Sequence, residues 1–219
     1  MPTLPEKQEP EGKPEKPETP QPEPGSGQSR EPAGPVKPAV TLSDIAGHWA
    51  EAAIKQAVAI GVVRGYPDGT FKPNRNITRA EFTVMLAGAL QLEGEGKPDA
   101  FTDREKIGAW ASRAVAQAAQ AGLIRGYADG SFRPEAAVTR AEMAAIVARA
   151  LHLPADPKAG TGFADDAAIP QWAKGSAAAL GKLGITSGRS GNRFAPNETA
   201  TRAEAAVFLL RMLKTMDDR

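Results

Sequence analysis

The sequence predicts an all-α protein: a pseudo-threefold bundle of three helix–loop–helix repeats with a central three-helix core, preceded by a disordered Pro-rich linker. The main support is internal repetition, because five residue types recur in register with spacings of 61 and 62 residues. The recurring residues are Trp49, Trp110 and Trp172; Gly65, Gly126 and Gly188; Phe71, Phe132 and Phe194; Pro73, Pro134 and Pro196; and Arg79, Arg140 and Arg202. We therefore expect repeats at 40–95, 96–156 and 157–219 that form one cooperative domain.

Residues 1–39 have a different composition from the repeats. They hold 11 of the 19 prolines, together with seven Glu and five basic residues, and they contain no Phe, Trp, Tyr or Ile. Such a segment cannot bury enough apolar surface to offset the entropy lost on ordering. We expect an extended, polyproline-like linker here.

Each repeat begins with apolar residues at helical spacing. In the first copy the stripe comprises Trp49, Ala53, Ala57 and Ile60, widened by Ile54 and Val58. This period is typical of an amphipathic helix. Gly61, Gly122 and Gly184 then stand at the C′ position, where a left-handed residue ends a helix.

A short loop and a second helix complete each copy. The Asp-Gly pair at 68–69 and 129–130 predicts a turn, under which the following Phe packs as a plug. Thr-Arg-Ala-Glu then recurs at 78–81, 139–142 and 201–204, and Thr with Glu three residues on is a capping box. We expect the second helices to meet at the centre, with the first helices and loops outside.

Composition excludes several functional classes. The whole chain carries +1 and residues 1–39 carry −2, which leaves +3 for the repeats without any Lys/Arg run; no nucleic-acid partner is expected. There is no cysteine, so disulfides and cysteine zinc sites are excluded, and we expect no metal or cofactor. No apolar stretch reaches 18 residues, so no membrane partner is expected. No signal peptide is visible, which fits either an internal protein or a piece of a longer exported one.

Arg79, Arg140 and Arg202 are the candidate binding residues that folding alone does not explain. Each stands at the first position of a helix, where a cation faces the positive end of the helix dipole at a cost of roughly 0.3–1 kcal/mol. One explanation is a partner carboxylate elsewhere. The other is an anion pocket, in which free helix N–H groups and the guanidinium bind a carboxylate or phosphate. A pocket predicts that alanine at Arg79 or Arg140 weakens binding with little change in thermal stability.

The other recurring residues also have two explanations each. Trp49, Trp110 and Trp172 are either core residues or flat surfaces for a sugar ring. Gly65, Gly126 and Gly188 either permit positive φ or let a ligand approach the backbone closely. Asp68 and Asp129 shape the turn, and they are kept among the candidate ligand residues. Trp, Gly and Arg in register fit a pocket for an acidic sugar.

No enzyme activity is expected, and we assign no catalytic residues. The two histidines, His48 and His152, do not stand at matching positions of the repeats. The repeated acidic residues are helix caps and a turn Asp, so no carboxylate pair is available for general acid–base work. The alternative to ligand binding is a protein–protein interaction or surface self-assembly module.

The aromatic-containing first helix, the Gly-Tyr-x-Asp-Gly-x-Phe-x-Pro loop and the Thr-Arg-Ala-Glu start resemble the S-layer homology (SLH) domains of bacterial surface proteins. The resemblance covers about residues 41–213. It implies non-covalent anchoring of a larger surface or S-layer protein to the bacterial cell wall, outside the cell, by a module that is monomeric in isolation. The implied ligand is a secondary cell-wall polysaccharide with pyruvylated N-acetylmannosamine, bound in grooves between repeats.

The same resemblance assigns roles to the recurring residues. Arg79, Arg140 and Arg202 match the motif Arg that meets the pyruvate carboxylate, and the recurring Trp and Gly match groove-lining positions. The third copy departs from the pattern, because Arg189 replaces Tyr, the turn Asp is missing and Ser187 replaces Arg64 and Arg125. We therefore expect unequal grooves, with the better sites in the first two copies.

Overall fold

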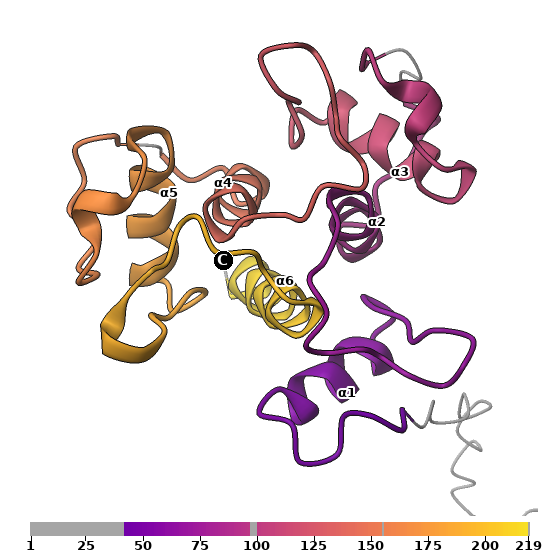
Figure 1. Cartoon of the computed structure of the whole chain (residues 1–219), viewed down its shortest axis with the longest axis horizontal. Helices are drawn as coiled ribbons and strands as arrows, with labels where there is room; N and C mark the ends of the chain where they lie inside the picture. The colour runs from indigo at the N-terminus through magenta and orange to yellow at the C-terminus, as the bar shows by residue number, and fades with distance from the viewer. Residues whose placement is uncertain (1–41, 97–99, 155, 219) are drawn as a thin grey trace, which may run out of the picture. The chain divides into compact units, whose positions relative to one another are not determined.

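The second helix of every repeat lies near the centre of the structure, and the first helices lie outside (Figure 1). The computed structural model describes residues 42–96, 100–154 and 156–218, so the predicted linker at 1–39 lies outside the described residues. The α-helices are α1 (Glu51–Ala59), α2 (Arg79–Ala89), α3 (Ala109–Gln120), α4 (Arg140–Ala150), α5 (Gln171–Lys182) and α6 (Arg202–Asp217). Short 3-10 helices cover Arg104–Lys106, Asp166–Ala168 and Ser190–Asn192. No strand occurs in the described ranges, and the all-α prediction is confirmed.

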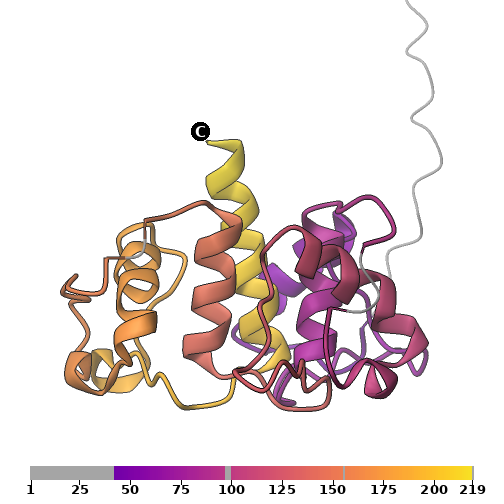
Figure 2. The same cartoon turned by 90° about the horizontal axis from the view of Figure 1, so that it is seen from above.

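Helices pair across the repeats rather than within them. α2 packs against α3 of the next copy, α4 packs against α5, and α6 packs against α1 of the first copy. α6 also contacts α2 and α4, and Figure 2 shows α4 and α6 running side by side. This cyclic pairing agrees with the expected pseudo-threefold bundle, whose symmetry itself stays a prediction.

The predicted helix ends are confirmed. The side chains of Thr78, Thr139 and Thr201 each accept a hydrogen bond from the backbone N–H of the Glu three residues on, and each Glu carboxylate accepts one from the backbone N–H of that Thr. Two otherwise unpaired N–H groups are satisfied at each start. At the other ends, Gly61, Gly122 and Gly184 have φ of 77°, 71° and 68°, as a left-handed C′ residue requires.

The predicted stripe of the first helix is partly wrong. Ile54 and Ala57 are buried, but Trp49 precedes α1 and is exposed, and Ile60 at its end is exposed too. Because α1 faces α6, the buried side of the helix is defined by Ala50, Ile54 and Ala57.

A closed ring of main-chain hydrogen bonds joins the three copies directly before the second helices. The Ile77 N–H donates to the carbonyl of Ala200, the Ala200 N–H donates to Val138, and the Val138 N–H donates to Ile77, over 3.0, 2.8 and 3.0 Å. All three residues are fully buried. The ring therefore fixes the starts of α2, α4 and α6 relative to one another.

The first N–H groups of these helices are also bonded to another copy. The N–H groups of Arg79 and Ala80 donate to the carbonyls of Ala136 and Pro134. The matching pairs are Arg140 with Glu198, Ala141 with Pro196, Arg202 with Arg75, and Ala203 with Pro73. The expectation of free N–H groups at these helix starts is therefore wrong, because a neighbouring loop already accepts their hydrogen bonds.

An Asp near the start of each copy holds the loop that carries the Phe plug. The Asp103 carboxylate accepts hydrogen bonds from the N–H groups of Phe132 and Arg133, over 2.7 and 2.8 Å. Arg133 has a φ of 57°, a strained value for a residue with a side chain. Asp44 and Asp165 hold the other two loops in the same way. The plugs Phe71, Phe132 and Phe194 are fully buried, as expected.

Replacing Asp103 with Asn should lower the free energy of unfolding by about 1–3 kcal/mol, because one amide cannot replace two charge-assisted acceptors. Burial raises the pKa of Asp103, but the N–H groups of Phe132 and Arg133 outweigh it, so the pKa lies below its ordinary value of 3.8. The carboxylate therefore stabilises the fold fully above pH 3.8, and this stabilisation disappears as the pH falls through the folded-state pKa.

Urea unfolding of the wild type and the Asp103→Asn variant at pH 7 and at acidic pH measures this difference. The stability gap should narrow at acidic pH. A gap that does not change with pH would exclude the carboxylate as its cause. Glu105→Gln, which removes an exposed carboxylate on the same segment, should leave stability nearly unchanged.

Candidate functional site

The three repeated tryptophans are exposed at the surface. Trp49, Trp110 and Trp172 have exposed fractions of 65, 59 and 58 %. Full burial of such a large apolar ring would be favourable, so three exposed rings at matching positions need an explanation. Of the two explanations offered by the sequence, the core position is wrong for all three.

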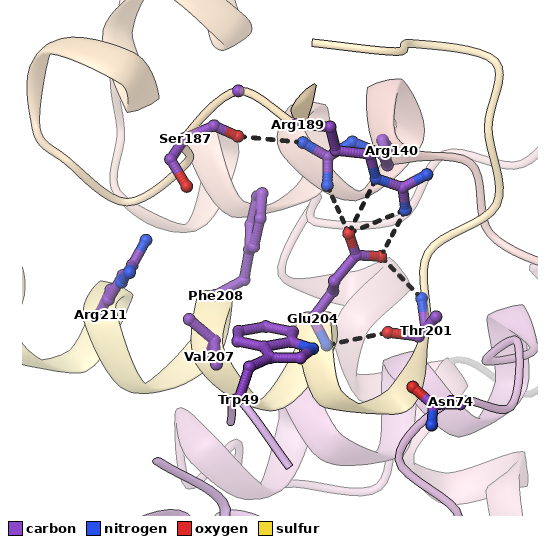
Figure 3. Close-up of a pocket in the computed structure, with 11 residues that line it drawn as sticks. Trp49, Asn74, Arg140, Ser187, Arg189, Thr201, Glu204, Val207, Phe208 and Arg211 are labelled. Carbon is purple, nitrogen blue, oxygen red and sulfur yellow. Dashed lines mark hydrogen bonds and ion pairs between the residues drawn. The ribbon is translucent and has the colours of Figure 1, made fainter. Parts of the chain in front are cut away.

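Trp49 lines a groove beside α6, which we call the α6 groove (Figure 3). Its volume of about 380 Å³ lies in the range of small-molecule sites. Arg140, Arg189 and Glu204 cluster at one end, Arg211 stands apart at the other, and Phe208 and Val207 lie between them. The lining residues are Trp49, Asn74, Arg140, Ser187, Gly188, Arg189, Thr201, Glu204, Val207, Phe208 and Arg211.

Trp172 lines a second groove of about 230 Å³ beside α4, which we call the α4 groove. Nine of its ten residues occupy the same repeat positions as residues of the α6 groove, shifted by one copy, and Ile124 is the exception. They are Arg79, Ile124, Arg125, Gly126, Tyr127, Glu142, Ala145, Ile146, Arg149 and Trp172.

Each groove combines residues of all three copies. In the α4 groove, Arg79 comes from the first copy, Tyr127 and Arg149 from the second, and Trp172 from the third. In the α6 groove each role is filled by a different copy: Trp49 comes from the first copy, Arg140 from the second, and most other lining residues from the third. The corresponding positions beside α2, called here the α2 positions, are Arg202, Arg64, Gly65, Tyr66, Glu81, Val84, Met85, Gly88 and Trp110.

The motif arginines are buried where one copy contacts the next, and we call these contacts the joints between copies. Arg79, Arg140 and Arg202 have exposed fractions of 6, 3 and 6 %. Each Nε donates to the carbonyl of the Phe plug in the next copy, over 2.7, 2.7 and 2.9 Å; these carbonyls belong to Phe132, Phe194 and Phe71. The cation at the first helical position is thus explained by an acceptor across the joint.

Carboxylates of the capping boxes form ion pairs with all three arginines, two of them close and the third longer. Arg79 lies 3.3 Å from Glu142, and Arg140 lies 2.8 Å from Glu204. The corresponding Arg202–Glu81 distance is 3.9 Å. Burial raises the pKa of Glu142, but hydrogen bonds from the Thr139 N–H, the Tyr127 hydroxyl and the Thr139 hydroxyl, with the charge of Arg79, hold it below its ordinary value. The partner carboxylate that the sequence left as one explanation is therefore present, and direct ligand contact by the motif arginines stays a prediction.

The change from Tyr to Arg189 in the third copy conserves one contact. The hydroxyls of Tyr66 and Tyr127 donate to Glu81 and Glu142, over 3.0 and 2.7 Å. Arg189 makes the matching contact, with its Nη2 2.8 Å from Glu204. The capping Glu of the third copy therefore meets two guanidinium groups.

The three repeated glycines are explained mainly by the compact loop. Only Gly126 has a positive φ, 70°. A Cβ atom would lie 2.4 Å from Leu42 at Gly65, 2.8 Å from Phe101 at Gly126, and 2.7 Å from Asn192 at Gly188. A side chain at any of these positions would collide with the protein itself unless a neighbour moved, and Gly126 and Gly188 additionally line the grooves.

Asp68 and Asp129 form the turns. The Asp68 carboxylate accepts hydrogen bonds from the N–H and hydroxyl of Thr70, and Asp129 accepts the same pair from Ser131. Neither residue lines the α4 or the α6 groove. The structure thus supports the turn explanation for both, and a ligand role stays a prediction.

Two kinds of residue were missed by sequence reasoning. The loop-holding Asp44, Asp103 and Asp165 escaped because their distance to the repeated Trp changes from five to seven residues. Arg149 and Arg211, on the groove walls, escaped because the first copy has Gly88 at that position. Their spacing of 62 residues was the available signal.

No metal site and no membrane-spanning helix is found among the described residues. Within 42–96, 100–154 and 156–218 there is no cluster of three or more His, Asp or Glu side chains suited to a metal ion. None of the helices in these ranges combines the length and apolar character needed to span a bilayer.

The fold and the site together define a class of protein. It is a helical module built from three repeats, with grooves that each copy helps to line. The model of the S-layer homology domain matches residues 41–83, 100–144 and 162–206. The chain belongs to the SLH domain family. SLH domains of S-layer and cell-surface proteins are non-catalytic modules that generally anchor their proteins to the cell wall through wall polymers.

Relatives include both enzymes and S-layer proteins. Exoglucanase XynX of Acetivibrio thermocellus is 38 % identical over 84 % of this chain and 17 % of its own length. Amylopullulanase of Thermoanaerobacterium thermosulfurigenes is 38 % identical over 80 % of the chain and 10 % of its own length. S-layer protein EA1 of Bacillus anthracis is 35 % identical over 75 % of the chain and 19 % of its own length. The chain thus spans less than a fifth of each of these relatives, and the enzymes among them act through other domains.

The burial of Arg79 reverses the stability expectation drawn from the sequence. Arg79→Ala leaves Glu142 half-buried without its cation and the Phe132 carbonyl without a donor. Removing one partner of a buried pair costs about 3–5 kcal/mol. Thermal or urea unfolding should therefore detect a large loss of stability.

Lys55→Ala is the matched control, because Lys55 forms an exposed ion pair with Glu51 within α1. Such pairs contribute at most about 1 kcal/mol. If both variants were equally stable, the buried pair would have no structural role and Arg79 would again be available for ligand binding alone.

Proposed function

We propose that this chain anchors a larger surface protein to the bacterial cell wall by binding an anionic wall polysaccharide in the α4 and α6 grooves. The single observation that carries the proposal is the pairing of an exposed tryptophan with several guanidinium groups in each groove. A tryptophan face packs on a sugar ring, and guanidinium groups suit carboxylates. The module would act outside the cell and fold as a monomer.

The ligand we propose is pyruvylated N-acetylmannosamine within a secondary cell-wall polysaccharide. A pyruvyl acetal adds a carboxylate to an otherwise neutral sugar, which matches grooves that combine an aromatic face with cations. Its supports are the SLH family membership and the groove chemistry described above. Several grooves on one module would also raise the overall affinity for a polymer, because later binding events are intramolecular.

Protein–protein interaction or self-assembly is the second candidate. The presence of S-layer proteins among the relatives favours it. An assembly interface needs about 1,000 Å² or more of buried area. The grooves are small by comparison, with volumes of about 380 and 230 Å³.

Cell walls stripped of protein provide the direct test. Such walls should remove the chain from solution, and mild acid that releases pyruvate should abolish the binding. Binding that survives the acid treatment would overturn pyruvate recognition and leave anchoring intact. No binding to untreated walls would overturn the anchoring proposal itself.

Trp172→Ala should weaken wall binding by a few-fold up to about tenfold, because a specific aromatic contact contributes about 0.5–1.5 kcal/mol. Its melting temperature should change little, since the ring is 58 % exposed. Ile60→Ala is the matched control, because Ile60 is 55 % exposed and lines neither groove. Equal wall binding by both variants would exclude Trp172 from the site.

A further inference from the structure

The α4 and α6 grooves contain cations that the fold does not neutralise. Arg79 is paired with Glu142, and Arg140 and Arg189 share Glu204. Arg149 and Arg211 donate instead to backbone carbonyls, of Leu123 and of Gly184 and Ile185. No carboxylate of the described ranges forms an ion pair with Arg125, Arg149 or Arg211.

Arg149 is the most constrained of these cations. It is half-buried on α4 and lines the same groove as Arg79 and Arg125. Burial lowers the pKa of Arg149, and the positive charges of Arg125 and Arg79 lower it further. The α4 groove is lined by three guanidinium groups and by a single carboxylate, that of Glu142.

We infer that the α4 groove is the principal anion site of the chain, in which Arg125 and Arg149 meet the ligand carboxylate while Trp172 packs on the sugar. This inference rests on the proposed function and assigns its charge recognition to residues outside the Thr-Arg-Ala-Glu motif. The motif arginines already bind carbonyls and capping carboxylates at the joints between copies.

The other two sets of positions each lack one of the two cations. In the α6 groove, Arg211 matches Arg149, but Ser187 stands where Arg125 would be. At the α2 positions, Arg64 matches Arg125, but Gly88 stands where Arg149 would be. Only the α4 groove has both, so its affinity for an anionic sugar should be the highest of the three.

Gly88 offers a place to restore the missing cation. A Cβ atom there would meet only the carbonyl oxygen of Val62, at an ordinary 4.0 Å. Val62 matches Leu123, whose carbonyl accepts the hydrogen bond from Arg149. Gly88→Arg can therefore place a guanidinium in the same setting, and Arg is also a better helix former than Gly.

The chain has three tryptophans, one for each set of positions, so every groove has its own reporter. The probe is the methyl glycoside of pyruvylated N-acetylmannosamine, titrated into the ¹⁵N-labelled full chain while the indole N–H signals are followed by NMR. The Trp172 signal should reach half-saturation at a concentration about tenfold or more below those of Trp49 and Trp110. One charge-assisted hydrogen bond supplies a factor of this size.

Two variants test the assignment in opposite directions. Arg149→Ala should weaken binding at Trp172 by about tenfold and leave Trp49 unchanged, whereas Gly88→Arg should tighten binding at Trp110. Lys182→Ala removes an exposed cation that lines neither groove, and it should change none of the three signals.

Equal half-saturation at the three indoles, or an unchanged Trp172 response in Arg149→Ala, would overturn the inference while anchoring stands. The same holds if the glycoside moves no indole signal but untreated walls still bind the chain. If the walls fail to bind as well, the proposed function and this inference fall together.

Discussion

The fold depends on the closed ring of hydrogen bonds between Ile77, Ala200 and Val138. Each of these residues directly precedes the capping Thr of a second helix, so the ring sets where α2, α4 and α6 start. The main-chain bonds of the first helical residues and the arginine bonds to the Phe plugs continue the same joint outward. Because each joint links two copies and the last returns to the first, no copy is completed by its own residues.

The grooves follow from this arrangement. When a second helix pairs with the first helix of the next copy, the tryptophan at the start of that first helix lies beside a loop from another copy. The joint uses the charge of Arg79 and Arg140 internally, through Glu142 and Glu204. What the groove offers to a ligand is therefore an exposed aromatic ring and the cations that the joint does not use.

The sequence was sufficient for the features that depend on neighbouring residues. The capping boxes, the glycine stops and the buried Phe plugs follow from local chemistry repeated three times, and all were confirmed. Helix periodicity does not specify which copy supplies the partner helix, so the pairing across copies and the role of Arg79 could not be derived. The same limit applies to Trp172, because an apolar residue in the first turn of a helix is buried or exposed according to what packs beside it. Arg149 lay outside the threefold pattern, since Gly88 interrupts it.

The central claim is that the three copies form one cooperative unit closed by this ring. Native-state hydrogen exchange of the amides of Ile77, Val138 and Ala200 measures it most directly, because each amide belongs to one of the three bonds. All three amides should open with the same free energy, equal to the free energy of global unfolding. The claim would be contradicted if one amide exchanged through an opening whose free energy lies several kcal/mol below that of global unfolding. That copy would then separate without the others.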